Sequence, residues 1–101
     1  MAKFLVTYFG GGMPSNPAEA AAAVEAFGQW LGRAGKAVVD PGAPLKPGSQ
    51  VAKGAPAPKV RIGGYSVIEA DDLDAALEVL RSHPFVSRGG TLQVDEAASI
   101  S

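Results

Sequence analysis

Residues 15–35, SNPAEAAAAVEAFGQWLGRAG, constrain the fold more than any other part of this chain. Asn16 is a good N-cap, Pro17 suits the first helical position, and Glu19 stands three residues after Asn16 as in a capping box. Gly35 is the residue type that commonly follows the last helical turn. The segment therefore predicts a long helix. Its apolar stripe consists of Val24, Phe27, Leu31 and Ala34, with Trp30 beside them.

Four other segments have the composition of strands, and one more has that of a helix. The strand-like segments are residues 4–9, 36–40, 60–70 and 91–96. The helical segment is DDLDAALEVLRSH, residues 71–83, which Asp71 or Asp72 caps and Pro84 ends. Its buried stripe is expected to contain Leu73, Ala76, Leu77 and Leu80.

The resulting order is strand, helix, strand, strand, helix, strand, which is the ferredoxin-like arrangement. We therefore predict a single α+β domain over residues 1–101, with an antiparallel sheet and both helices on one face. Residues 41–59 hold five of the eight prolines and form a long loop that is either functional or mobile. The tail, residues 97–101, is expected to be loose.

The first strand is apolar on both faces. Phe4, Val6 and Tyr8 point to one face, and Leu5, Thr7 and Phe9 point to the other. A sheet that is open to water on one side alternates apolar with polar residues, so the second face needs a cover. A second copy of the same sheet would supply it and give a symmetric homodimer. The alternative is an aromatic-rich strand that arose by chance.

Composition excludes several classes of protein. The pI is near 5.7, with 10 acidic and 9 basic residues, so the positive field of a nucleic-acid binder is missing. The chain has no cysteine, and its one histidine rules out a histidine-rich metal site. No segment reaches the roughly 18 apolar residues of a membrane helix, and no export signal is recognised. We expect a cytoplasmic protein with no cofactor, metal, nucleic-acid or membrane partner.

Two residues could carry catalytic chemistry at the loop-rich end of the predicted sheet. Asp40 ends the second strand and could act as a general base, or it could simply initiate the turn at Pro41-Gly42 through its side chain. His83 is the only group that normally titrates near neutrality. It could act together with Asp40, or it could be a cation that interacts favourably with a helix C-terminus.

Ligand-binding candidates are expected at the same end of the sheet. Three of them belong to the glycine-rich connection after the first strand, where backbone N–H groups could hold an anion; the alternative is a flexible connection. Arg61, near the end of the long loop, could attract an anionic ligand. Tyr65 could contribute an aromatic side chain to the site, or it could belong to the core or to a dimer interface. These candidates are Gly11, Gly12, Met13, Arg61 and Tyr65.

The segments MAKFLVTYFGGGMP, GKAVVDPGAPL, IGGYSVIEADDLDAALEVL and GGTLQVDE resemble the YCII-related, or DGPF-domain, family over residues 3–96. The resemblance implies a dimeric α/β barrel made of two ferredoxin-like units. Members have been proposed to be enzymes through a histidine on the first helix and an aspartate after the second strand. Asp40 matches that aspartate, whereas Val24 or Glu25 occupies the histidine position, and APAPKV replaces the DGPF signature.

The family resemblance and the residues leave two functions open. The first is a small-molecule site, binding or enzymatic, near Asp40 at the loop-rich end of the sheet. Activities similar to those of dehalogenases and muconolactone isomerases, described in or near the family, agree with it. The second is a non-catalytic, dimeric interaction or regulatory module, which agrees with the association of other members with alternative sigma factors.

Overall fold

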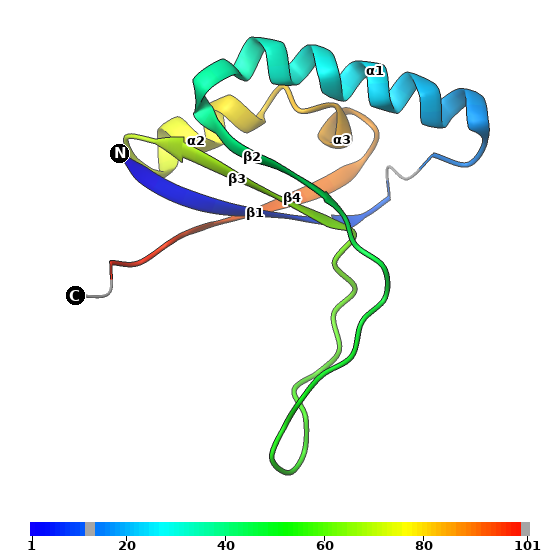
Figure 1. Ribbon diagram of the computed structural model, residues 1–101, viewed down its shortest axis with the longest axis vertical. Coiled ribbons are helices and arrows are strands. Elements are labelled where there is room, and N and C mark those ends of the chain that lie inside the picture. The colour runs from blue at the N-terminus through cyan, green and yellow to red at the C-terminus, as the bar shows by residue number, and fades with distance from the viewer. Residues whose placement is uncertain (12–13, 100–101) are drawn as a thin grey trace.

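The computed structural model describes residues 1–11 and 14–99. Four strands and three α-helices follow one another along the chain (Figure 1). They are β1 (Ala2–Gly10), α1 (Pro17–Ala34), β2 (Val38–Pro44), β3 (Gly64–Ala70), α2 (Leu73–Leu80), α3 (Pro84–Ser87) and β4 (Gly90–Glu96), with a 3-10 turn (Gly35–Ala37) between α1 and β2.

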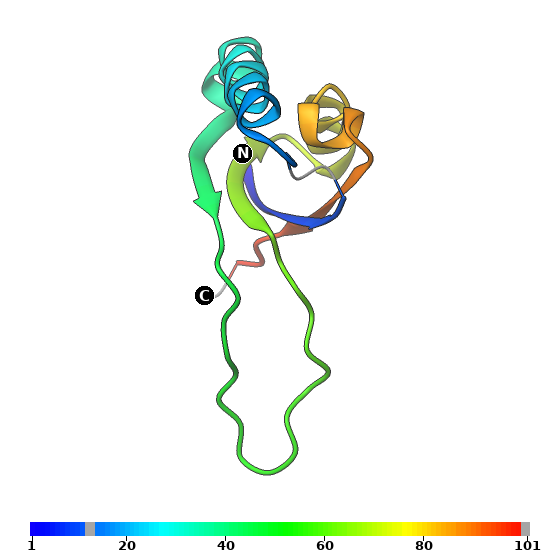
Figure 2. The same ribbon diagram turned by 90° about the vertical axis from the view of Figure 1, so that its right-hand side faces the viewer.

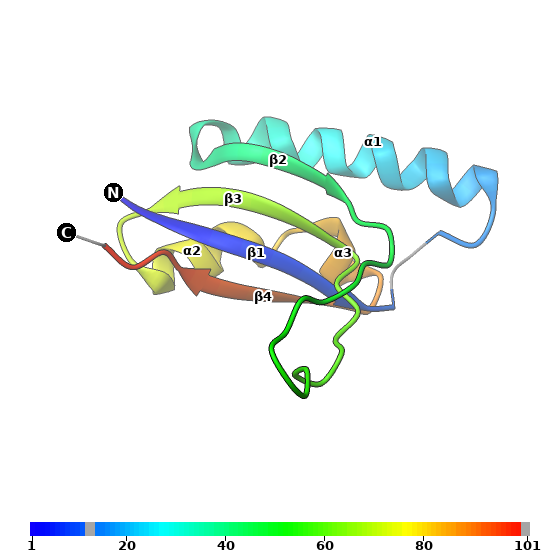
Figure 3. The same ribbon diagram turned by 60° about the horizontal axis from the view of Figure 1, so that its bottom comes forward.

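The strands form one antiparallel sheet in the order β2-β3-β1-β4. The helices lie together on one face of this sheet, and the other face carries none of them (Figures 1 and 3). This arrangement confirms the predicted α+β class and is consistent with a ferredoxin-like fold. Among the described residues, no helix is both long and apolar enough to cross a membrane.

The core lies between the sheet and the helices. Its buried residues are Phe4 and Val6 on β1, Ile68 and Ala70 on β3, Ala76 and Leu80 on α2, and Trp30 on α1. The Trp30 indole N–H donates to the carbonyl of Val79 at 3.3 Å, so α1 is also attached to α2. Trp30 is therefore the residue through which α1 packs into the core, whereas the sequence placed it beside the apolar stripe of the helix.

Val24 does not belong to the buried stripe of α1, because 74% of it is exposed. It lies about a third of a turn away from Trp30 around the helix, on the side that faces solvent. The N-cap prediction is confirmed, since the Asn16 side chain accepts a hydrogen bond from the Glu19 backbone N–H at 2.8 Å.

The helix predicted over residues 71–83 is shorter than expected. The helix begins after its cap, Asp72, and ends at Leu80, and a second short helix starts at Pro84. His83 is the N-cap of α3, with an extended backbone (φ −65°, ψ 132°). The physical reason is Pro84, which disfavours a helical conformation at the residue before it and suits the first position of a new helix.

Strand β2 continues through the predicted turn at Pro41-Gly42. Its pairing with β3 shifts register on both sides of Asp40, so β2 has one extra residue before Asp40 and one after it, the latter opposite Ser66. Gly42 has φ +75°, and a Cβ there would lie 1.7 Å from the carbonyl oxygen of Tyr65. Only glycine fits this position, and a bulge in an edge strand also accommodates a proline.

The long loop accordingly runs over residues 45–63, and we call it the arm. It extends from the sheet as two limbs joined by a turn (Figure 2). Of the predicted loose tail, Ala97 is attached to the body, because its N–H donates to the Lys3 carbonyl at 2.8 Å. Residues 100–101 lie outside the described part of the chain.

Candidate functional site

A chain of hydrogen-bonded polar side chains runs through the end of the sheet from which the arm leaves. Tyr8 comes from β1, Ser66 from the centre of β3, and His83 from the junction of α2 and α3. The Tyr8 hydroxyl lies 2.8 Å from Nε2 of His83 and 2.8 Å from Oγ of Ser66. Oγ of Ser66 in turn lies 2.8 Å from the carbonyl oxygen of Pro41 in the β2 bulge.

The partners at the two ends determine the direction of every hydrogen bond in this network. The Pro41 carbonyl can only accept, so Ser66 donates its single proton there and must accept from Tyr8. At the other end, the Phe85 backbone N–H donates to Nδ1 of His83 at 3.0 Å. His83 therefore carries its proton on Nε2 and donates it to the Tyr8 oxygen.

Both titratable members of the network are neutral near pH 7. Burial, with a smaller contribution from the charge of Arg88, lowers the pKa of His83 to about 4. Burial raises the pKa of Tyr8, and Ser66, whose hydroxyl can turn to donate to the ionised Tyr8 oxygen, opposes that rise. His83 is only 2% exposed and is packed among rings, with its centroid 4.5 Å from that of Trp30 and 5.2 Å from that of Tyr8.

The network borders a cavity of about 240 Å³. Its wall is mainly apolar, and the Tyr8 hydroxyl, the imidazole of His83 and the cationic side chain of Arg88 are among the polar groups of the residues around it. The lining residues are Tyr8, Pro14, Phe27, Pro41–Pro44, Gly63–Tyr65, His83–Phe85 and Arg88. The β2 bulge and the root of the arm thus form one wall, and residues around α3 form the opposite one.

Asp40 and His83 are not brought together. Asp40 is exposed, and its Oδ1 accepts a hydrogen bond from the Gly42 backbone N–H at 2.8 Å. This is the local turn-forming bond that an aspartate before Pro-Gly commonly makes. Both ring nitrogens of His83 are engaged by Tyr8 and Phe85, and His83 caps a helix N-terminus instead of ending a helix.

The ligand-binding candidates have different environments. Tyr65 is part of the cavity wall. Arg61 is exposed and donates to the Leu45 carbonyl at 3.0 Å and to its neighbour Ile62, so its guanidinium bridges the two limbs at the root of the arm. Gly11 is an exposed bend near the Gly89 carbonyl. Gly12 and Met13 lie outside the described residues.

Tyr8 and Ser66 were not predicted as members of a site. The sequence held one signal for them: in GYSVIEA, residues 64–70, Ser66 occupies an inward position between Gly64 and Ile68. A fully buried hydroxyl requires a hydrogen-bond partner, so this serine indicates a polar neighbour on an adjacent strand. The register places it opposite Val6, two residue pairs from Tyr8 and on the same face of the sheet.

No protein-family profile matches the chain, and no curated protein matches its sequence. Among solved structures, the chain is similar to the 5-chloro-2-hydroxyhydroquinone dehydrochlorinase TftG from Burkholderia phenoliruptrix AC1100, described in complex with 2,5-dihydroxybenzoquinone. The two chains are 16% identical, the match covers 90% of each chain, and the TM-score is 0.55. At this level of identity the similarity shows a shared fold.

Proposed function

We propose that the cavity is a binding site for a small, single-ring molecule that carries hydroxyl or carbonyl oxygens. The observation that carries this proposal is the neutral hydrogen-bond network of His83, Tyr8 and Ser66 beside an apolar cavity. A largely apolar pocket with a few placed polar groups is the usual form of a small-molecule site. The site lies at the loop-rich end of the sheet, where the sequence favoured one.

The size and lining of the cavity limit the ligand. Its volume of about 240 Å³ is below the range of about 300–1,000 Å³ typical of sites for drug-sized molecules. Phe27 and Phe85 offer aromatic surfaces to a flat ring, and Arg88 favours a phenolate or carboxylate substituent. The molecule bound to TftG, 2,5-dihydroxybenzoquinone, is likewise a single ring with hydroxyl and carbonyl oxygens.

Tyr8 is the group through which this site would act on a ligand oxygen. At neutral pH an uncharged His83, with Nδ1 occupied by the Phe85 N–H, does not serve as the base. Tyr8 can instead turn its proton from Ser66 toward a ligand, while His83 continues to donate to the Tyr8 oxygen. Proton transfer at that oxygen is the step available to an enzymatic version of the site, and it does not involve Asp40.

We also propose that the chain is a homodimer through the open face of the sheet and a member of the YCII-related family. Leu5 is 44% exposed on that face, and its neighbours in register are Val67 on β3 and Asp95 on β4. Tyr65 and Phe9 extend the apolar surface. The fold shared with TftG supports this relationship.

Titration of the protein with 2,5-dihydroxybenzoquinone, hydroquinone and benzoate, followed by amide NMR shifts, tests the proposed site. We expect shifts that cluster on the cavity wall, and the Tyr8→Phe variant should bind about tenfold more weakly because one hydrogen bond to the ligand is lost. Val24→Ala, on the exposed side of α1, is the control and should bind as the wild type does. Unshifted cavity amides with all three compounds would favour the non-catalytic interaction module.

A further inference from the structure

We infer that the arm, residues 45–63, clasps the body of a second copy of this chain. The inference rests on the proposed dimer and adds to it a contact that the apolar sheet face alone does not supply. It assigns a partner to a segment that has almost no contact with its own body.

The root of the arm is rigidly attached to the sheet. The Leu45 N–H donates to the Gly63 carbonyl at 2.9 Å, and the Gly63 N–H donates to the Tyr8 carbonyl at 2.7 Å. Arg61 connects the two limbs through the Leu45 carbonyl. The direction in which the arm leaves the sheet is therefore determined by the fold.

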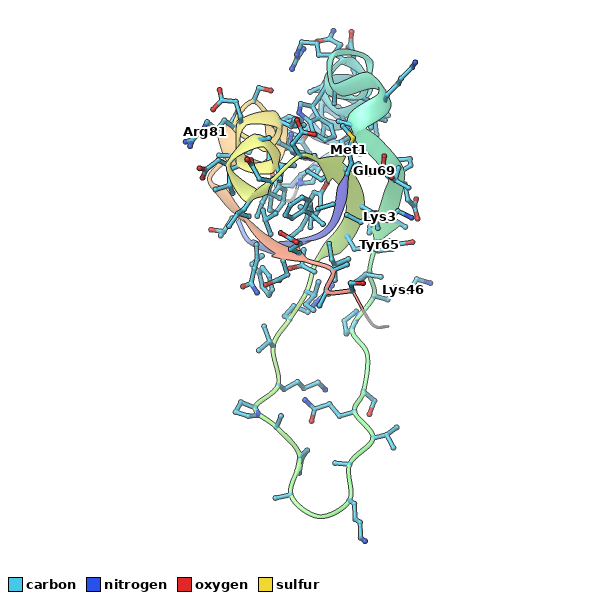
Figure 4. All side chains as sticks on the ribbon, turned by 90° about the vertical axis from the view of Figure 1, so that its left-hand side faces the viewer. Met1, Lys3, Lys46, Tyr65, Glu69 and Arg81 are labelled. Carbon is cyan, nitrogen blue, oxygen red and sulfur yellow. The ribbon has the colours of Figure 1, made fainter. Side chains whose placement is uncertain are left out.

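Beyond its root the arm is surrounded by solvent. Residues 45–61 are all exposed, and Val51 is as exposed as in an isolated peptide. Figure 4 shows this segment extending away from the body, with Lys46 near the point where it leaves. Ordering each residue of such a segment costs about 1–2 kcal/mol of backbone entropy, and contacts within one chain do not offset it here.

The arm projects on the side of the sheet that the helices leave uncovered (Figures 1 and 2). A second sheet stacked on that face would lie about 10 Å away. Each limb has about nine residues and can reach about 30 Å, so it crosses the gap and extends along the partner's body. Two-fold symmetry would let each copy hold the other in the same way.

The charges of the arm and the body are complementary. The arm contains Lys46, Lys53, Lys59 and Arg61 and no acidic residue. The rest of the chain therefore keeps five of the 9 basic residues and all 10 acidic residues. A cationic arm is attracted to the anionic body of a second copy, and body–body repulsion in the dimer is reduced.

Sedimentation equilibrium of the wild type and two arm variants tests the clasp. In one variant Gly-Ser replaces residues 48–57, and the other is Lys46→Glu/Lys53→Glu/Lys59→Glu. The first variant retains Leu45 and Arg61–Gly63, so the root of the arm and the cavity wall are preserved. Single Lys53→Glu and Lys36→Glu variants make a matched pair, because the latter places the same charge change in the body.

We expect a wild-type dimer whose Kd rises with salt, and both arm variants should raise that Kd about tenfold or more at low salt. Lys53→Glu should weaken the dimer, and Lys36→Glu should not. A wild-type dimer with the same Kd in both arm variants would overturn the clasp and leave the stacked-sheet dimer in place. A monomeric wild type would overturn both the clasp and the dimer, whether or not the arm binds another macromolecule.

Discussion

The Tyr8 hydroxyl and Nε2 of His83 are 2.8 Å apart although the two residues are separated by 75 positions in the chain. Their rings meet edge to face with centroids 5.2 Å apart. This pair joins β1, one of the two inner strands of the sheet, to the junction between α2 and α3. It also places the polar end of the proposed site against the hydrophobic core.

The first prediction concerns stability against pH. The pKa of His83 falls from an ordinary 6.5 in the unfolded chain to about 4 in the folded protein. Between these pH values the unfolded chain binds more protons, so the free energy of unfolding should decrease as pH falls from 6.5 toward 4. We expect a loss of about 2–3 kcal/mol, measured by urea denaturation.

The control for this prediction is His83→Gln, which removes the titrating ring but retains groups that can form hydrogen bonds. It should be less stable than the wild type at pH 7, and its free energy of unfolding should change much less between pH 6.5 and 4. An equally steep loss in the variant would assign the pH dependence to other groups.

The second prediction concerns the β2 bulge. Gly42→Ala should destabilise the protein by at least about 2 kcal/mol, because the new Cβ would meet the Tyr65 carbonyl oxygen and a positive φ would be forced on alanine. Gly48→Ala is the matched control, since a Cβ at Gly48 meets no atom within 4 Å and its φ lies outside the left-handed region. Thermal denaturation of both variants measures the difference. Equal melting temperatures would contradict the close approach of β2 to β3.

The third prediction concerns Ser66. Ser66→Ala should cost about 1–3 kcal/mol, because the Pro41 carbonyl loses its donor and the Tyr8 hydroxyl loses its acceptor. The same change should raise the pKa of Tyr8 further, because the Ser66 hydroxyl can turn to donate to the ionised Tyr8 oxygen and thereby lowers that pKa. Urea denaturation and the pH titration of the Tyr8 ring carbon by NMR provide the two measurements.

The matched control is Ser49→Ala in the exposed arm, which should change neither quantity. A Tyr8 titration in Ser66→Ala that is unchanged from the wild type would show that the two hydroxyls are not bonded in solution.

Much of the fold followed from local patterns. Asn16, Pro17 and Glu19 predicted the start of α1, and the two-residue alternation of β1 separated Phe4 and Val6 from Leu5. The predicted ends of elements were less accurate at two prolines. Pro84 was expected to stop the helix, and α2 does end before it, but the start of α3 at Pro84 was not predicted. Pro41-Gly42 was expected to end β2, yet a bulge continues the strand through these residues.

The sequence by itself determined the order of the elements, because periodicity and capping depend on residues a few positions apart. For the same reason it showed that β1 is apolar on both faces, although the helices of one chain cover only one. Only the tertiary structure decided the site. It turned His83 from a surface candidate beside Asp40 into a buried, neutral partner of Tyr8 and Ser66. Segments distant in sequence bury His83 and form its hydrogen bonds, and the local sequence pattern carries no information about these contacts.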